Sequence, residues 1–408
     1  MSAHEHQSPV HRPPESVDGS ADVKLERDMP RSAQADAQPL LDRLHKMLGT
    51  GPFAISGGVF AAATPGGETI IAATGVDAAD RPIDEHSLMP LASASKLATG
   101  LLILRLIDRG DLALDEPIGS YLPDAAAAGT PGVTIRRLLS HTAGMGLEVA
   151  HEFSDPPGPL IWRDGLQWPG EIAEACLASA PATEPAAMLQ YSNIGYGLLG
   201  LAAERVASQP FARLLDREVF DPLGIEAYVD RLPEREPIKV TDIPSPAAGT
   251  SLEPYNSEVS RLNGGPWAGV TSNAQGLLAL VRAYAGDGGL LSPEVSKVAR
   301  SDQTGGVSGG FTTTDAFLGH GPSRRIVWDP CPWGLSVEVQ GGKQPHWAPA
   351  ALPDSFGQIG SSGCLAWCDP VSGVSWAVLG ARTTEGGWLL RHGARLAQTA
   401  ILCGTRQS

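Results

Sequence analysis

Apolar residues recur at helical spacing in many stretches of the chain. Residues 40–47 carry four such positions and predict a helix that ends at Gly51. The apolar run over residues 98–107 extends a predicted helix that begins at Ser93 and closes at Arg109-Gly110. The same spacing predicts further helices over residues 133–139, 170–178, 194–206, 210–220, 273–284 and 386–402.

Strand patterns lie toward the two ends of the chain. Residues 53–64 and 68–75 alternate or run apolar, and Pro65-Gly66-Gly67 between them is a hairpin signal. The chain would leave one antiparallel sheet for a helical region and then return to it, which predicts an α+β fold. The three predicted C-terminal strands cover residues 333–340, 357–369 and 374–382.

This pattern divides the chain into three parts. Residues 39–120 and 321–408 form the predicted sheet domain, and residues 121–320 form a mainly helical domain. Residues 1–38 are polar and contain several prolines, so we expect a disordered tail. The tail has no apolar segment of the kind found in secretory signals, and no stretch approaches the roughly 18 apolar residues that span a bilayer. These features predict a cytoplasmic protein.

The net charge of the 408 residues is −15 at pH 7. This charge argues against non-specific binding of nucleic acid and of anionic membranes, so neither is an expected partner. The cysteines are odd in number and scattered, which gives neither a disulfide framework nor a zinc site. We expect them to be core residues; they are Cys176, Cys331, Cys364, Cys368 and Cys403.

Candidate chemistry begins with Ser93 and Lys96, which are three residues apart at the start of a predicted helix. That spacing places both side chains on one face of the first turn. A serine hydroxyl becomes a good nucleophile when a neighbouring base removes its proton, and a lysine in an apolar setting can be that base. The alternative is a helix cap followed by a surface cation.

A second candidate is Tyr191-Ser192-Asn193, which precedes the helix predicted from residue 194. A tyrosine near a lysine ammonium is expected to have a lowered pKa and to pass a proton. The asparagine amide can hold both a substrate carbonyl and the lysine. The alternative is that Tyr191 caps the following helix.

A third candidate is the glycine-rich strand over residues 356–363. Glycine weakens a strand unless another group must approach the backbone closely, and an acyl substrate is one such group. The N–H of Ser361 could then join that of Ser93 as an oxyanion hole. The alternative is a bulge or a tight sheet corner.

In this order the motifs resemble those of the serine β-lactamase and penicillin-binding-protein superfamily, in the branch with class C β-lactamases, DD-peptidases and related esterases. Ser93-x-x-Lys96 matches the first motif and Tyr191-x-Asn193 matches the second. Gln358-Ile359-Gly360 occupies the place where members of this superfamily have Lys-Thr-Gly or His-x-Gly. The resemblance covers residues 40–402, with matching flanks at 111–123, 138–145, 220–225 and 267–278.

The resemblance implies a β-lactamase/transpeptidase-like fold and an acyl-enzyme mechanism that needs no metal or organic cofactor. Ser93 would attack a carbonyl of a small-molecule acyl substrate, and Lys96 and Tyr191 would exchange the proton. His141 belongs to a family signature and is expected to stabilise its loop rather than react. The expected substrate and oxyanion residues are Asn193, Gln358, Gly360 and Ser361.

Gln358 departs from the family pattern, because a neutral amide cannot supply the charge that binds a substrate carboxylate. The sequence therefore favours a serine hydrolase of the carboxylesterase type acting on a small-molecule ester. Three alternatives stay open: an acyltransferase in small-molecule biosynthesis, a β-lactamase or D-amino-acid peptidase, and a catalytically degenerate binding or sensor protein.

Two weaker signals concern other residues. Residues 306–310 fit the G-x-S-x-G pattern, but polar residues on both sides favour a glycine loop over a nucleophile elbow. The loop over residues 341–354 lies just before Gln358, so it is expected either to line an acyl or alcohol pocket or to be an inert insertion. Trp162 and Trp347 are the pocket residues that we predict.

Overall fold

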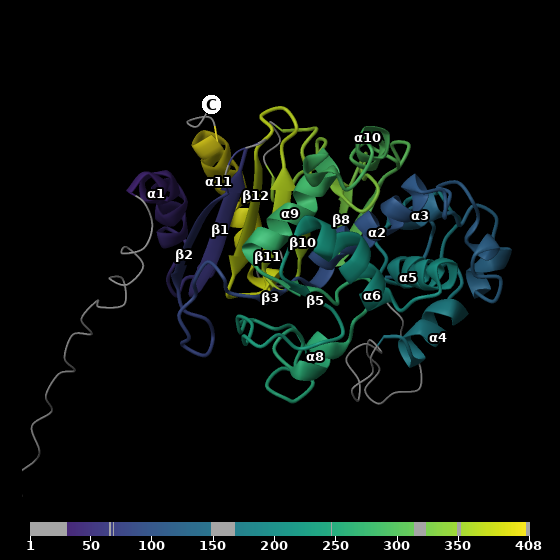
Figure 1. Cartoon of the computed structure of the whole chain (residues 1–408), viewed down its shortest axis with the longest axis horizontal. Coiled ribbons are helices and arrows are strands. Elements are labelled where there is room, and N and C mark those ends of the chain that lie inside the picture. Colours follow the sequence, from purple (N-terminus) through teal and green to yellow (C-terminus); the bar gives the residue numbers. More distant parts are fainter. Residues whose placement is uncertain are drawn as a thin grey trace, which may run out of the picture.

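The structure, a computed structural model, describes residues 31–64, 67, 69–147, 168–245, 247–313, 324–348 and 352–404. The predicted α+β fold is confirmed. Figure 1 shows the N-terminal strands (purple) beside the C-terminal strands (yellow) in one antiparallel sheet. Its strand order is β2 (Ile70–Gly75), β1 (Gly57–Ala63), β12 (Ser375–Gly380), β11 (Cys364–Cys368), β10 (Phe356–Gly360) and β9 (Glu338–Val339).

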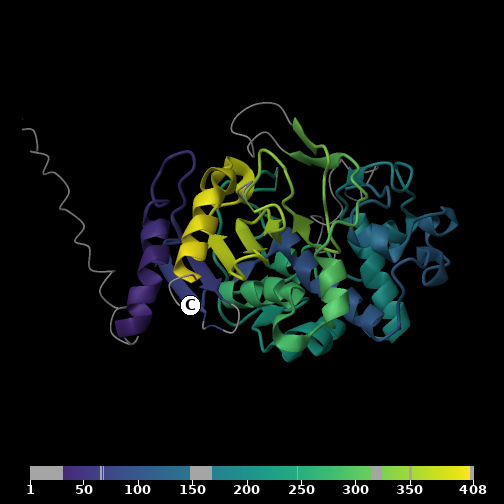
Figure 2. The same cartoon turned by 90° about the horizontal axis from the view of Figure 1, so that it is seen from above.

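The central strands are buried on both faces, because helices cover both sides of the sheet. Successive side chains of a strand point to opposite faces. In β1, Val59 and Ala61 join one apolar cluster, while Phe60 and Ala62 join the other. Helices α2 (Lys96–Asp108) and α9 (Ala274–Ala285) cover the first cluster. Helices α1 (Arg31–His45) and α11 (Trp388–Gly404) lie side by side over the second (Figure 2).

The part of the chain that runs from the end of β2 to the start of β9 carries the remaining helices and two small sheets. The small sheets are β3 (Met89–Pro90), β6 (Thr271–Ser272) and β5 (Ala227–Tyr228), and β4 (Leu189–Gln190), β7 (Gly309–Thr313) and β8 (Arg324–Trp328). The helices are α3 (Ile135–Leu139), α4 (Glu171–Ala178), α5 (Ile194–Ala207), α6 (Phe211–Leu215), α7 (Asp221–Leu223), α8 (Glu258–Leu262) and α10 (Pro293–Ala299).

Polar caps define the ends of several of these helices. The Asn273 side chain accepts a hydrogen bond from the N–H of Gly276 at the start of α9, and Ser292 does the same for Val295 in α10. Gly286 ends α9 with a φ of +98°, a left-handed conformation that glycine adopts without strain. These local signals explain why α9, predicted over residues 273–284, was located to within one residue.

Three expectations about the elements were wrong. Helix α1 begins at Arg31, so residues 31–38 are helical rather than part of a disordered tail; alanines alternate through this stretch and favour helix. Residues 357–369 are not one strand but the hairpin of β10 and β11. Within residues 333–340 the strand is only β9, because Ser336 adopts a φ of +70° that breaks it. The predicted domain boundaries stay a prediction.

The G-x-S-x-G stretch is also only partly the predicted loop. Gly309 and Gly310 begin strand β7, and a Cβ on Gly309 would lie 2.2 Å from the carbonyl oxygen of Leu189 in β4. Ser308 therefore precedes a strand rather than a helix, so it does not form a nucleophile elbow.

The five cysteines are buried, as predicted. Burial raises the pKa of Cys176, Cys331 and Cys364 to about 12. They are neutral thiols near pH 7, and thiols of this kind are unreactive.

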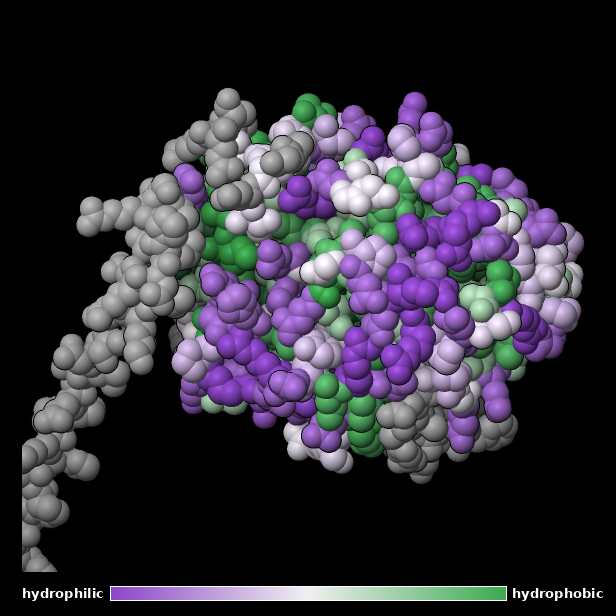
Figure 3. All heavy atoms as spheres, in the orientation of Figure 1, coloured by the Kyte–Doolittle hydropathy of each residue, from purple (hydrophilic) through white to green (hydrophobic). Residues whose placement is uncertain are grey.

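The outer face drawn in Figure 3 is mostly hydrophilic, and its apolar residues gather in small areas. Within the described ranges, every helix is too short or too polar to cross a bilayer.

Candidate active site

Ser93 is placed by a tight turn at the entrance to α2. A 3₁₀ helix over Ala92–Ser95 runs directly into α2, and Ala92 has a φ of +46°, which is unusual for a residue with a side chain. The Ser95 hydroxyl accepts a hydrogen bond from the N–H of Val270 at 3.0 Å, which ties the turn to the neighbouring chain. Ser93 itself is partly exposed and lines a cavity of about 90 Å³, together with Asn193 and Ser361.

Lys96 is fully buried, which excludes the alternative of a surface cation. Its Nζ lies 3.3 Å from the Ser93 hydroxyl, 2.7 Å from Asn193 Oδ1 and 3.1 Å from the carbonyl oxygen of Trp267. The structure therefore brings the first motif and Asn193 of the second motif together around one amine.

Of these three contacts of Lys96 Nζ, the one with Ser93 can exchange a proton. The oxygens of Asn193 and Trp267 are acceptors only, so they fix two N–H groups of Lys96. The third position faces the Ser93 hydroxyl, which can both donate and accept. A neutral Lys96 would accept the serine proton there, and an ammonium would give a proton back.

Tyr191 is hydrogen-bonded to Ser93, and the Lys96 Nζ lies 4.8 Å from the centre of its ring. The expected lowering of its pKa was wrong. Burial raises the pKa of Tyr191 above its usual value, the hydrogen bond to Ser93 opposes this shift, and the Glu338 carboxylate adds to it. Tyr191 is therefore a phenol at neutral pH and is suited to donate a proton rather than to remove one.

The second motif is held by its neighbours rather than by a tyrosine cap. Ser192 caps α5, because its hydroxyl accepts a hydrogen bond from the N–H of Gly195 at 2.9 Å. Asn193 precedes the helix, but its side chain binds Lys96 instead of capping. The capping alternative for Tyr191 is thus excluded.

His141 lies beneath this motif and is almost completely buried. Its Nδ1 accepts a hydrogen bond from the N–H of Ser192 at 3.1 Å, and its ring centre lies 4.3 Å from that of Tyr191. Burial, and then the charge of Lys96, lower the pKa of His141 well below 6.5, so the ring is neutral. His141 is a support for the Tyr191 ring, in line with the role expected for it.

We expect the stability of the fold to decrease as the pH falls below about 6.5, in part because of His141. The unfolded chain takes up a proton on this histidine near pH 6.5, while the folded chain does not. The contribution of neutral His141 to the free energy of unfolding is complete above pH 6.5. Below that pH it is lost at up to about 1.4 kcal/mol per pH unit. Urea unfolding at pH 7.5 and 5.5 should show this loss.

His141→Asn is the matched variant for this prediction. Asparagine tolerates the φ of +58° at this position and retains an acceptor for the Ser192 N–H, but it does not titrate. Between pH 7.5 and 5.5 the wild type should lose about 1 kcal/mol more than His141→Asn. Equal losses in the two proteins would show that His141 is not the group responsible.

The glycine strand packs directly against the nucleophile turn. A Cβ on Gly360 would lie 2.0 Å from the carbonyl oxygen of Leu91, so the close approach requires glycine. Ser361 follows at the end of β10 and lines the same cavity as Ser93. Among the described residues, the N–H groups of Ser93 and Ser361 have no backbone acceptor outside their own helix or strand. Both remain available as the proposed oxyanion donors.

Gln358 does not reach the cavity. It lies on β10 with its side chain on the same face as Phe356, toward α2 and α9, and is 1% exposed. Its Nε2 donates to the carbonyl oxygen of Ser336 at 3.2 Å. The amide at the third-motif position thus stabilises the interior and does not line the cavity beside Ser93.

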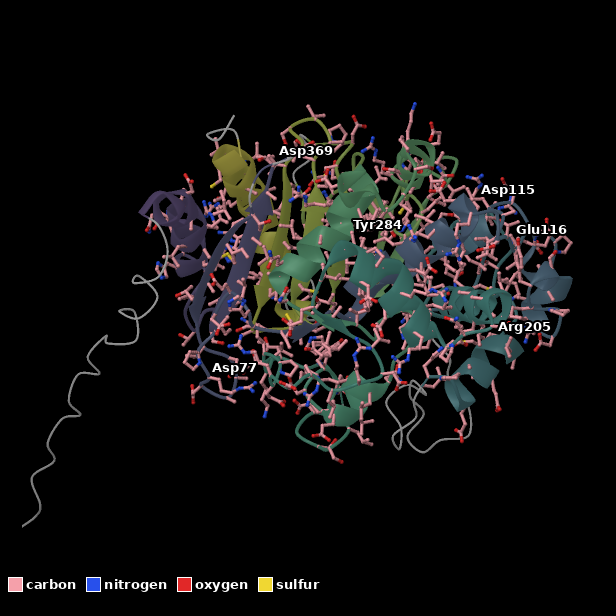
Figure 4. All side chains as sticks on the ribbon, viewed as in Figure 1. Asp77, Asp115, Glu116, Arg205, Tyr284 and Asp369 are labelled. Atoms are coloured by element: carbon pink, nitrogen blue, oxygen red, sulfur yellow. The ribbon has the colours of Figure 1, made fainter. Side chains whose placement is uncertain are left out.

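Ser336 is a junction that the sequence did not reveal. Its N–H donates to the carbonyl oxygen of Leu139, and its hydroxyl accepts a hydrogen bond from Tyr196 at 2.7 Å. Tyr284, labelled at the centre of Figure 4, also bonds to this serine and donates to Leu97 of α2 at 2.9 Å. A residue with φ of +70° between two buried tyrosines leaves no local pattern in the sequence.

Of the two predicted pocket tryptophans, Trp347 does not line the cavity. Trp162 lies outside the described residues. Trp347 is 2% exposed and belongs to the apolar cluster under α1 and α11, where its carbonyl group would clash with a Cβ on Gly393. The cavity wall comes instead from the chain around α8, including Tyr255 and Arg261, which the sequence analysis missed.

The sequence resembles those of known proteins. The beta-lactamase family model matches residues 54–400. Esterase EstB of Burkholderia gladioli is 33% identical over 282 residues, which are 63% of this chain and 71% of EstB. The D-alanyl-D-alanine-carboxypeptidase/endopeptidase AmpH of Escherichia coli K12 is 29% identical over 150 residues, which are 34% of this chain and 36% of AmpH.

Solved structures have the same fold. A penicillin-binding-protein homologue from Caulobacter crescentus superposes with a TM-score of 0.65 at 24% identity, covering 87% of this chain and 96% of the homologue. EstCE1, described as a hydrolase with promiscuous acyltransferase activity, gives a TM-score of 0.61 at 23% identity, covering 91% and 97%. At these identities the likeness extends to the fold alone.

Proposed function

The chain belongs to the beta-lactamase family and is a serine hydrolase of that superfamily, and on this premise we propose that it is a carboxylesterase acting through an acyl-enzyme on Ser93. The observation that carries the proposal is the position of Lys96, whose Nζ lies 3.3 Å from the Ser93 hydroxyl. Two further contacts of Nζ are to oxygens that only accept, and they orient the amine toward Ser93.

Acylation follows from these contacts. Neutral Lys96 takes the proton of the Ser93 hydroxyl as the serine oxygen forms a bond to the ester carbonyl carbon. The negative charge moves to the carbonyl oxygen, where the N–H groups of Ser93 and Ser361 stabilise it. Such a donor is worth roughly 3 kcal/mol.

Collapse of this intermediate breaks the bond to the alcohol. Tyr191 is a phenol beside Ser93, so it donates its proton to the leaving alkoxide and regains one from the Lys96 ammonium. Water then attacks the acyl group by the reverse sequence, and the acid leaves. Asn193 holds both Lys96 and the substrate carbonyl in place during both halves.

The choice of an ester rests on the charges around the cavity. Gln358 is neutral and turned into the interior. Arg261 is the charged residue that lines the cavity, and its Nη1 is paired with Glu236 at 3.2 Å and bonded to the carbonyl oxygen of Asn256. Gln358 supplies no cation to a substrate carboxylate, and the charge of Arg261 is already paired with Glu236, which favours a neutral acyl donor over a β-lactam or a D-alanyl peptide.

The test combines labelling with product analysis. A fluorophosphonate should add once to the protein by intact mass, and Ser93→Ala should abolish the adduct, while Ser308→Ala should keep it. The wild type should hydrolyse p-nitrophenyl butyrate much faster than nitrocefin or a D-alanyl-D-alanine peptide.

Three outcomes would replace this proposal with an alternative. Nitrocefin turnover equal to ester turnover would identify a β-lactamase. An excess of new ester over acid in the presence of added alcohol would identify an acyltransferase. Failure of every acyl donor and of the fluorophosphonate to react would identify a binding protein.

A further inference from the structure

The cavity beside Ser93 has two walls that come from distant parts of the chain. One wall comes from the chain around α8 and includes Tyr255, Ser260 and Trp267. The other includes Ser361, in the turn between β10 and β11. The size of the space between them decides which acyl groups can reach the nucleophile.

A pair of hydroxyl groups joins these walls. The hydroxyl oxygen of Tyr255 lies 2.8 Å from that of Ser361, although the two residues are 106 positions apart in sequence. Both line the cavity that also contains Ser93. We name this hydrogen bond the Tyr255–Ser361 latch.

Each side of the latch is held separately by its own neighbours. Tyr255 has a φ of +66°, an uncommon value for an aromatic residue, and its N–H donates to the Ser260 hydroxyl at 2.9 Å. Ser361 accepts a hydrogen bond at its carbonyl oxygen from the N–H of Thr384 at 3.0 Å. Strained residues of this kind persist where the surrounding structure fixes them, often at ligand sites.

The cavity is small. Its volume is about 90 Å³, whereas pockets for drug-sized ligands occupy about 300–1,000 Å³. A short acyl group fits in such a space, whereas a long chain would have to separate Tyr255 from Ser361.

We propose that the Tyr255–Ser361 latch limits the enzyme to esters of short acyl groups and that Tyr255 is the specificity-determining residue. This inference rests on the proposed function, because it concerns the acyl group that Ser93 accepts. Since the latch is a hydrogen bond between two side-chain hydroxyls, removing either partner should widen the range of acyl chains.

The experiment measures selectivity in two independent ways. One is the ratio of kcat/KM for p-nitrophenyl octanoate to that for p-nitrophenyl butyrate. The other is the ratio of labelling rates at Ser93 with p-nitrophenyl hexylphosphonate and methylphosphonate, read by intact mass. The second readout needs only the attack of Ser93 and does not depend on turnover.

Both ratios should rise about tenfold in Tyr255→Phe and in Ser361→Ala, and more in Tyr255→Ala, since a few methylene groups change selectivity by such factors. The double variant Tyr255→Phe/Ser361→Ala should match the single variants, because all three remove the same bond. Tyr228→Phe, which removes a hydroxyl bonded to Glu226, is the control and should leave both ratios unchanged.

The outcomes separate this inference from the proposed function. Ratios unchanged in Tyr255→Ala, or a wild type that accepts long and short chains equally, would overturn the latch and leave the esterase standing. Additive shifts in the double variant would also overturn it. Methylphosphonate labelling without turnover of any ester would overturn the esterase and leave the latch testable by labelling, and the absence of any adduct would overturn both.

Discussion

Replacing Lys96 by methionine is expected to lower kcat/KM for p-nitrophenyl butyrate by about 10⁴-fold, the upper range for the loss of a general base. Methionine preserves the apolar stem but offers no site for the Ser93 proton. The hydroxyl would have to lose its proton to water, which is a far weaker base than an amine. Steady-state kinetics at pH 7.5 measures the effect, with circular dichroism to verify the fold.

Lys96→Arg separates the transfer of a proton from the presence of a charge. A guanidinium keeps the positive charge but is not deprotonated in proteins, so this variant should lose nearly as much activity as Lys96→Met. Lys297→Met, on the exposed face of α10, is the control and should retain wild-type activity. If Lys96→Arg kept more than a tenth of the activity, Lys96 would act by its charge and not as the base.

Much of the site could be predicted because its geometry is local. Ser93 and Lys96 meet across one helical turn, and Asn193 is fixed two residues after Tyr191, immediately before α5. The meeting of the two motifs is not local, since 97 residues separate Lys96 from Asn193. Their order along the chain and the resemblance to a family supplied that step.

The fold was predicted where the spacing of apolar residues and the turn-forming residues indicated the same element. The antiparallel sheet from both ends of the chain followed from apolar runs such as 374–382, which contains β12. The β10–β11 hairpin was missed because its turn, Ser361-Ser362-Gly363, lies inside the glycine-rich motif and was taken for a close approach to substrate. Both readings describe the same residues, since Ser361 ends the strand and also lines the cavity.

The remaining errors concern contacts between residues distant in sequence. Gln358 bonds to Ser336, and Tyr255 bonds to Ser361 across 106 positions, and neither pair has a periodic signature. The direction of the Tyr191 pKa shift depends on how deeply the fold buries the phenol, which spacing does not reveal. The cytoplasmic location, the absence of a cofactor and the expected partners stay predictions.

Replacing the buried Lys343 by methionine is expected to lower the free energy of unfolding by about 3–5 kcal/mol. Its Nζ is 2.8 Å from Glu338 Oε1 and 2.7 Å from the carbonyl oxygens of Pro332 and Val339, and both charged side chains are essentially unexposed. Burial alone would raise the pKa of Glu338, but Lys343 and then His346 hold it below its usual value. Without the lysine, the carboxylate stays buried, with the His346 ring 3.0 Å away from it.

Urea unfolding at pH 7.5 measures this loss, and a second substitution tests its origin. In Lys343→Met/Glu338→Gln the uncompensated charge is gone, so the double variant should be more stable than Lys343→Met although it carries one more change. Lys297→Met makes the same substitution at an exposed position and should alter stability by less than about 0.5 kcal/mol. A double variant less stable than Lys343→Met would mean that lost packing and unpaired carbonyls, rather than the buried charge, set the cost. Since Glu338 also acts on Tyr191, the same pair of variants shows whether this ionic cluster affects the catalytic phenol or only the fold.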